Sequence, residues 1–180
     1  MCLNYLRVNE VVPSVGEVWK PPPALFFKLN FDAAVFLENQ RIGFGAIIQN
    51  DKGEVMAAMA AVGPPVSSSE EAKLLACRKA VEFATDAGFP ELVTEGDNSN
   101  VMRAISSSMA DLSLLGNVVD DVHHLVFGLN CVNFSYTTRG GNKVAHALAQ
   151  YAKNISEDVF CMEDSPPLAI NALYHDSLLI

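Results

Sequence analysis

Between residues 26 and 62 the chain reads as three β-strands in close succession. The first strand, FKLNFDAAVF, alternates in polarity, with Leu29 and Phe31 on one face and Asn30 and Asp32 on the other. The turn sequence NDKGE joins the second strand, RIGFGAIIQN, to the third, EVMAAMAAV. Strands connected by short turns pair antiparallel in the simplest arrangement, so this stretch predicts a three-stranded antiparallel unit.

The second of these strands contains two glycines, Gly43 and Gly45. A glycine inside a strand often marks a bend, or a place where another backbone comes close. The sequence leaves both interpretations open.

Helical segments alternate with two further strands in the second half of the chain. Residues 69–87 carry apolar side chains at helical spacing, acids in the first turn and Gly88 after the end. Two short strands follow, ELVTEGD and CVNFSYT, with the helical segments NSNVMRAISSS and SLLGNVVDDVHHLVFGL between them and GNKVAHALAQYAK after them. This order predicts an α/β fold with a mixed five-stranded sheet (three antiparallel strands, then two helix-linked strands) and helices on both faces.

A single domain is expected between two flanking segments. Prolines at positions 13, 21, 22 and 23 exclude a continuous helix or a central strand, so residues 1–24 are interpreted as a tether. Residues 25–153 are expected to form the domain. Residues 154–180 are expected to form a C-terminal tail that either packs against the domain or stays mobile.

The composition is that of a globular protein, with 50% hydrophobic and 18% charged residues. No apolar run reaches the roughly 18 residues that a membrane helix needs, and the N-terminus lacks the basic flank and apolar core of a signal peptide. We therefore expect an intracellular protein, nuclear or cytoplasmic, with no membrane partner, and we expect it to be a monomer. The four cysteines are scattered, without a C-x-x-C pair, which favours reduced thiols.

The net charge of −9 restricts the function. Proteins whose main function is to bind phosphate backbones carry clustered Lys and Arg residues. The negative net charge therefore argues against a protein of that nucleic-acid-binding class. It does not exclude an enzyme that reaches nucleic acid through metal ions held by carboxylates.

Asp32 lies in an otherwise apolar strand, where an unpaired carboxylate is costly. Asp97 ends the strand ELVTEGD, and the two acids face each other if the first and fourth strands are parallel neighbours. Two close carboxylates repel unless a cation lies between them, and Mg²⁺ is the hard, oxygen-seeking candidate. In the alternative, Asp97 caps the following helix and Asp32 is a satisfied acid at a strand edge.

Five motifs together resemble the type 1 ribonuclease H domain: NFDAAVF, GFGAIIQNDKGEV, EEAKLLACRKAVEFA, TEGDNSNV and GGNKVAHALAQYA. The closest resemblance is to the plant form that is similar to the ribonuclease H domain of non-LTR retroelement reverse transcriptases. It covers about residues 19 to 170. It implies a ribonuclease H-like fold and a nuclease that cleaves the RNA strand of an RNA–DNA hybrid, with Mg²⁺ or Mn²⁺ as cofactor.

In this family, an Asp–Glu–Asp core and a fourth acid hold two divalent ions for phosphoryl chemistry. The resemblance assigns the first and third acids to Asp32 and Asp97. The glutamate position holds Lys73, within the stretch AKLLACR, and the fourth acid position holds His146, within NKVAHALA. Half of the expected carboxylate set is therefore replaced.

Lys73 would place an ammonium beside the two aspartates, and such a cluster is neutralised without a metal ion. Glu70, about 4.5 Å earlier along the helix axis and on roughly the same face, is the candidate replacement ligand. His146 either shuttles a proton and favours Mn²⁺ over Mg²⁺, or hydrogen-bonds a neighbouring acid. The candidate catalytic residues are thus Asp32, Asp97, Glu70 and His146, and the first three are candidate metal ligands.

Four further residues are candidates for contacts with nucleic acid: Asn98, Arg139, Asn142 and Lys143. Asn98 also fits a capping role. Three functions remain open: a metal-dependent nuclease, a domain that kept the fold for binding and lost the reaction, and a purely structural module. The two replaced acids argue against the nuclease. The partner that the resemblance implies is an RNA–DNA hybrid or another nucleic acid.

Overall fold

The computed structural model describes residues 18–107 and 115–163. The strands are β1 Phe27–Phe36, β2 Arg41–Gln49, β3 Val55–Gly63, β4 Glu91–Gly96, β5 Cys131–Tyr136 and β6 Val159–Met162. The α-helices are α1 Ser69–Asp86, α2 Ser99–Ser106, α3 Gly116–Val126 and α4 Lys143–Tyr151, and two 3₁₀ turns, Arg139–Asn142 and Ala152–Asn154, flank α4. No helix within these residues is long and apolar enough to cross a membrane.

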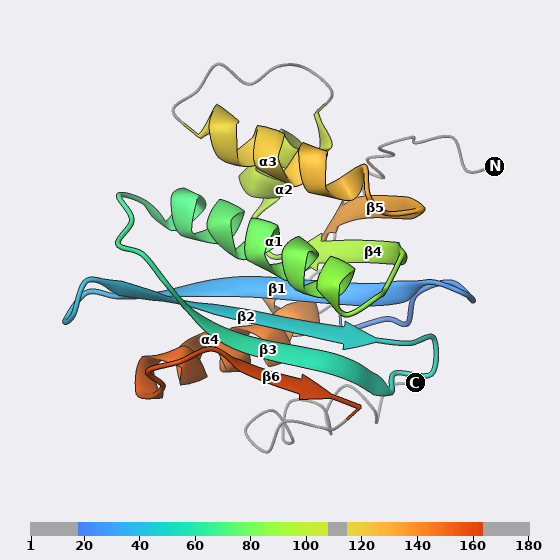
Figure 1. The fold of residues 1–180 in the computed structure, drawn as a ribbon, viewed down its shortest axis with the longest axis horizontal. Helices are drawn as coiled ribbons and strands as arrows, with labels where there is room; N and C mark the ends of the chain where they lie inside the picture. Colours follow the sequence, from blue (N-terminus) through green and yellow to red (C-terminus); the bar gives the residue numbers. More distant parts are fainter. Residues whose placement is uncertain (1–17, 108–114, 164–180) are drawn as a thin grey trace.

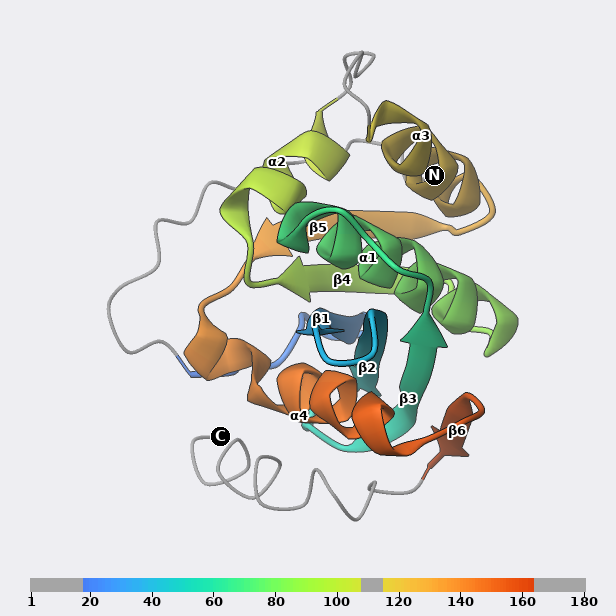
Figure 2. The ribbon, with the colours of Figure 1, turned by 90° about the vertical axis from the view of Figure 1, so that its left-hand side faces the viewer.

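The six strands form one mixed sheet in the order β5-β4-β1-β2-β3-β6. The unit β1–β2–β3 is antiparallel, as predicted, and β4 pairs parallel with both β1 and β5. Helices α1, α2 and α3 lie on one side of the sheet, and α4 covers β1 and β2 from the other side (Figure 1, Figure 2). The predicted mixed sheet with helices on both faces is confirmed.

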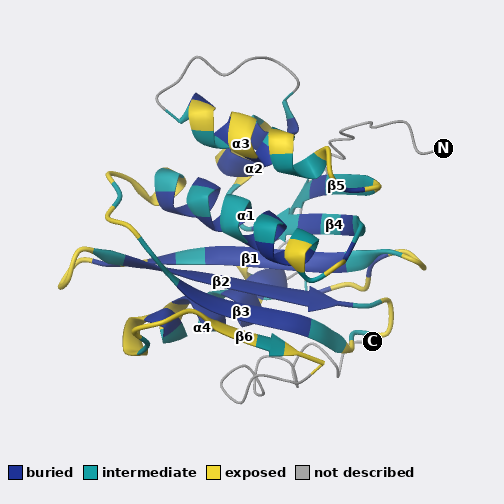
Figure 3. Ribbon diagram, viewed as in Figure 1, coloured by how far each residue is buried: buried dark blue, intermediate teal, exposed yellow. Residues whose placement is uncertain are grey.

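The predicted number of five strands is wrong, because β6 adds a sixth. It pairs antiparallel with β3, with Phe160 opposite Met59, and it lies in the segment 154–180 that the sequence assigns to a tail. Four residues are too short for a pattern of alternation to be recognised, and the pairing depends on the free edge that β3 offers. β1, β2 and β3 are buried along most of their length, whereas β6 is largely exposed (Figure 3).

The glycines of β2 allow α4 to lie directly against the sheet. A Cβ atom on Gly43 would come within 2.2 Å of the Ala149 carbonyl oxygen, and one on Gly45 within 2.1 Å of the Ala145 carbonyl oxygen. Of the two interpretations of these glycines, the close backbone approach is therefore the one observed. The short distance between β2 and α4 also brings His146 close to β1.

Trp19 joins the segment before β1 to the sheet. Its side chain is buried, and its indole Nε1 donates a hydrogen bond of 3.1 Å to Asn30 Oδ1. The described end of the expected tether, from residue 18 onward, thus contacts the domain.

Candidate functional site

Asp32 and Asp97 lie together where β1 and β4 run parallel. Asn30 is paired with Glu95, and the same register continued by two residues puts Asp32 opposite Asp97, just past the end of β4. Their side chains are only 1% and 4% exposed. The sequence-based prediction that the two acids face each other agrees with this arrangement.

Helix α1 places Lys73 between the two aspartates. The helix begins after Ser68, whose Oγ accepts a hydrogen bond from the Glu71 backbone N–H, and Glu71 in turn accepts from Ser67. These two hydrogen bonds fix the first turn of the helix, and its buried face carries Lys73 toward the sheet. Hydrogen bonding from the Ser67 side chain also holds the pKa of Glu71 below its ordinary value.

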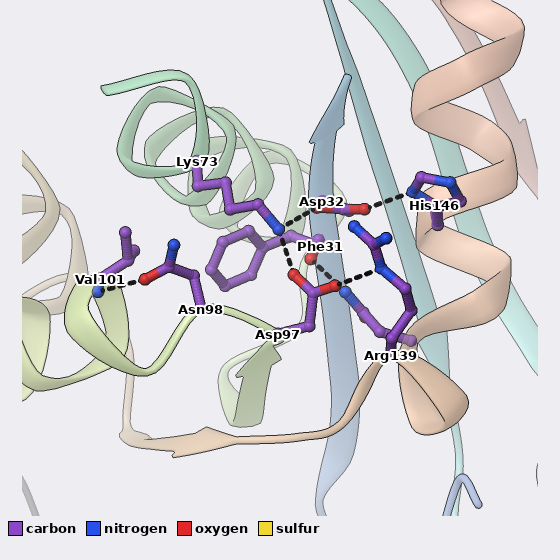
Figure 4. A network of polar contacts seen from close by, with 9 residues as sticks. Phe31, Asp32, Lys73, Asp97, Asn98, Val101, Arg139 and His146 are labelled. Atoms are coloured by element: carbon purple, nitrogen blue, oxygen red, sulfur yellow. Dashed lines mark hydrogen bonds and ion pairs between the residues drawn. The ribbon is translucent and has the colours of Figure 1, made fainter. Parts of the chain in front are cut away.

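The Lys73 ammonium bridges the carboxylate pair. Its Nζ is 2.9 Å from Asp32 Oδ1 and also donates to Asp97 Oδ1 (Figure 4). Burial by itself would lower the pKa of this ammonium, but the charges of Asp32 and Asp97, together with its hydrogen bonds to them, outweigh burial and raise the pKa. Lys73 is therefore a cation at neutral pH, enclosed by two anions.

The remaining oxygen of each aspartate also faces a nitrogen atom. Asp32 Oδ2 lies 2.8 Å from His146 Nδ1, and Asp97 Oδ2 lies 3.4 Å from Arg139 Nε (Figure 4). All four carboxylate oxygens of the pair thus lie within ion-pair distance of a nitrogen atom, although Asp32 Oδ1 meets Lys73 by charge and distance without a well-aligned hydrogen bond. For His146, the alternative of a hydrogen bond to a neighbouring acid is the one observed.

A divalent ion does not fit this set of side chains. Mg²⁺ and Mn²⁺ need several oxygen ligands that are free to face the ion, and here the oxygens face Lys73, His146 and Arg139. In the part of the chain that the structure describes, no group of three or more His, Cys, Asp or Glu side chains could hold a metal ion. With Lys73 and Arg139 counted against Asp32 and Asp97, the formal charge of the cluster is already zero.

Glu70 is not brought into this cluster. Its Oε1 accepts a hydrogen bond of 3.0 Å from Asn100 Nδ2 at the surface, beside the start of α2. The position one turn later on the same helix, Lys73, takes the place beside the aspartates. The geometry therefore gives no support to Glu70 as a third metal ligand or catalytic residue.

The four candidates for nucleic-acid contact divide into two kinds. Asn98 caps α2 by accepting from the Val101 backbone N–H at 3.0 Å, and Asn142 is buried, with its Nδ2 donating to the Phe31 carbonyl at 2.9 Å. Both side chains are engaged in holding the fold next to the aspartates. Lys143, the first residue of α4, is exposed, and Arg139, in the 3₁₀ turn before it, is 73% exposed although its Nε faces Asp97.

A second polar cluster on the same face of β1 has no role in the sequence-based predictions. Lys28 Nζ is 2.7 Å from Glu95 Oε1, and Asn30 Nδ2 donates to Glu95 Oε2 at 3.3 Å. The Lys28 ammonium also lies 5.6 Å from the centre of the Trp19 ring. The alternation of β1 predicts that Lys28 and Asn30 lie on the same face as Asp32. It does not predict that Glu95 of β4 is their partner.

A central mixed sheet with an aspartate on β1, a second at the end of β4, and helices on both sides defines this chain as an α/β domain with the ribonuclease H-like fold. Its sequence matches the family described as Reverse transcriptase-like over residues 30–152, and the chain belongs to that family. A search of curated proteins found no match.

Solved structures share the fold at low sequence identity. RNase H1 from the halophilic archaeon Halobacterium salinarum NRC-1 is 20% identical, with a TM-score of 0.64 over 72% of this chain and 98% of that chain. The N-terminal RNase H domain of a Mycobacterium tuberculosis protein, solved as a fusion with maltose-binding protein, is 18% identical, with a TM-score of 0.62 over 72% and 94%. LC11-RNase H1, from a compost metagenome and solved in complex with an RNA/DNA hybrid, is 17% identical, with a TM-score of 0.61 over 71% and 96%.

Proposed function

We propose that this domain binds nucleic acid and does not cleave it. The observation that carries the proposal is the Lys73 ammonium, which contacts both Asp32 and Asp97. Hydrolysis with two divalent ions needs those ions at the carboxylates, where they activate water and stabilise the leaving oxygen. An ammonium at the same place neutralises the acids but cannot generate a metal-bound nucleophile.

Binding without metal is supported by the charge of the cluster. A bare pair of aspartates would repel a phosphate, whereas the pair compensated by Lys73 and Arg139 has no net formal charge. Lys143 then provides an exposed cation that the aspartates do not balance, and Arg139, which faces Asp97 through Nε and is 73% exposed, can contact phosphate through the rest of its guanidinium group. The fold-level analogy to LC11-RNase H1, which was solved with an RNA/DNA hybrid, favours a hybrid as the first ligand to test.

The competing function is a divalent-metal-dependent endonuclease on RNA–DNA hybrids. It is favoured by the presence of both aspartates side by side, since a domain kept only for binding has no need of two buried acids. In that case Lys73 would have to leave the aspartates when metal and substrate bind.

Incubation with a labelled RNA–DNA hybrid in Mg²⁺, in Mn²⁺ and in chelator tests both functions together. We expect no cleavage in any buffer, and binding that is the same with and without chelator. The double variant Arg139→Ala/Lys143→Ala should weaken binding roughly fivefold or more at low salt and flatten its salt dependence, because phosphate contacts release counterions. Lys52→Ala, an exposed lysine in the turn between β2 and β3, is the matched control and should bind like the parent.

Cleavage by the parent that disappears in Asp32→Asn would contradict the proposal and establish a working nuclease. Binding that is lost in chelator would contradict the metal-independent part of it.

A further inference from the structure

The sheet ends on one side at β6, and this edge strand is apolar at its surface. Val159, Phe160 and Met162 are 38%, 53% and 50% exposed, and they make up three of its four residues. Edge strands are usually protected against pairing by being very short, as β6 is with four residues, and by lysine, proline or a β-bulge. β6 carries no lysine or proline, and its register with β3 is regular, without a bulge. None of the exposed large hydrophobic residues in the described ranges lies on the other edge strand, β5.

The backbone of β6 also presents hydrogen-bonding groups to its open side. Glu163 N donates to Met56 O at 2.9 Å, which identifies these two residues as a hydrogen-bonded pair of the antiparallel ladder. Because such pairs alternate along the ladder, the N–H and C=O groups of Phe160 and Met162 point away from β3. No described strand pairs with β6 on that side.

A groove of about 320 Å³ adjoins this edge, between β6 and the C-terminal half of α1. Phe83 of α1 and Phe160 of β6 form its apolar part, with ring centres 5.7 Å apart. The groove is lined by Lys79, Glu82, Phe83, Asp86, Ala87 and Phe160. It can therefore take an apolar side chain that projects from a strand added to β6.

Acidic side chains surround this apolar centre. Glu82 and Asp86 lie near the C-terminal end of α1, whose last turn contains no basic residue, and a helix C-terminus is itself partially negative. Glu82 is 4.0 Å from Arg78 in an exposed pair, which compensates its charge only in part. Lys79, the cation among the lining residues, is paired with Asp158 at 3.4 Å, and Glu163 follows β6 directly. The groove is thus complementary to basic side chains.

We propose that β6 and this groove bind an extended segment of another protein in which apolar and basic residues stand two positions apart, so that both kinds of side chain project from the same face of the added strand. The segment would add to the sheet as a further strand beside β6, with an apolar side chain over Phe83 and Phe160 and basic side chains near Glu82 and Asp86. A second copy of this chain fits less well, because each copy presents the same acids and carries a net charge of −9. This protein-binding surface goes beyond the proposed nucleic-acid binding and uses none of its residues.

A short fluorescein-labelled peptide with the repeat Val-Thr-Lys-Thr, which places valine and lysine on the same face of a strand, tests the proposal by fluorescence anisotropy with the full chain. We expect saturable binding that weakens about tenfold in Phe160→Ser, which removes a large apolar contact. Glu82→Gln/Asp86→Asn should weaken it roughly threefold, since exposed ion pairs are individually modest. Phe127→Ser, which alters an exposed phenylalanine after α3, is the control and should bind like the parent.

A second peptide of the same sequence, N-methylated at alternate residues, keeps the charge but cannot pair as a strand along one edge. We expect it not to bind. Equal binding of the two peptides, no effect of Phe160→Ser, or no binding of the first peptide to the full chain would each overturn the proposal. A dimer in sedimentation that Phe160→Ser dissociates would also overturn it and assign the edge to a second copy. Met162→Ser serves as the second variant if circular dichroism shows that Phe160→Ser does not fold.

Discussion

Lys73 controls the electrostatics of the carboxylate pair, because among the described residues it is the cation that contacts both Asp32 and Asp97. Its side chain is 11% exposed, so the attraction is little screened by water. Two buried carboxylates without this ammonium would repel each other and lack compensation. The ammonium that lies between the two acids therefore also stabilises the fold around them.

The stability of the protein should depend on the Lys73 ammonium and on pH. Because its pKa is raised above 10.5 in the folded state, the ion pairs stabilise the fold fully below about pH 10.5, and this contribution is lost as the pH rises through the folded pKa. Lys73→Met should lower the free energy of unfolding at pH 7 by about 3–5 kcal/mol, the cost of breaking a buried pair. Urea denaturation of both proteins from pH 7 to pH 11 measures the difference, which should shrink at the alkaline end.

Lys52→Met is the control for this measurement, because Lys52 is exposed in a turn and should change stability little at any pH. A difference between parent and Lys73→Met that stays constant up to pH 11 would contradict the role given to the ammonium.

The sequence predicts the main residues of the site but not all of their contacts. The strand pattern and the family resemblance place Asp32, Asp97 and Lys73 together, and the structure agrees. The hydrogen bond from Asn142 to the Phe31 carbonyl could not be predicted, because it joins residues that are far apart in the sequence. The surface position of Glu70 depends in the same way on Asn100 of another helix.

At the scale of elements, the contact between β2 and α4 positions one side of the site. Gly45 faces the Ala145 carbonyl, and the next residue of α4, His146, reaches Asp32. The strand can approach the helix this closely only without a side chain at Gly45. The packing of α4 and the position of His146 are therefore coupled.

Replacing Gly45 with alanine should push α4 away from the sheet. The added Cβ would lie 2.1 Å from the Ala145 carbonyl oxygen, so the helix must move, and overpacking of this kind costs about 1–3 kcal/mol or more. Gly128→Ala is the matched control, since its Cβ would meet only an ordinary contact at 3.4 Å from Leu125 O. Thermal melts of both variants test this, and a Gly45→Ala variant as stable as the parent would show that the close approach is not needed.

The order of the elements from β1 to α4 follows from the sequence because each has a long enough pattern of its own. Alternation identifies β1, and helical spacing with acids in the first turn identifies α1. β6 differs, since its four mostly exposed residues carry no distinguishing pattern and its pairing is decided by β3. A strand such as β6, which forms only because a neighbouring strand offers it a partner, is therefore not predicted from its own sequence pattern.

At the scale of the whole molecule, an acidic chain with a net charge of −9 carries a compensated cluster beside Arg139 and Lys143, the exposed cations of the proposed nucleic-acid surface. Long-range repulsion of phosphate by that net charge should keep binding weak and sensitive to salt. The acidic groove at β6 has the opposite preference, for basic segments. The two surfaces thus favour partners of opposite charge.

The central claim is that the Lys73 ammonium takes the place of a metal ion, and thermal melts of parent and Lys73→Glu, in chelator and in Mn²⁺, test it most directly. We predict that the parent melts at the same temperature in both buffers. Lys73→Glu brings a third carboxylate to Asp32 and Asp97, so it should be strongly destabilised in chelator and regain stability in Mn²⁺, because an ion that binds only the folded state stabilises it. A parent protein that Mn²⁺ stabilises, with the effect abolished by Asp32→Asn, would contradict the claim and show that the aspartates still bind metal.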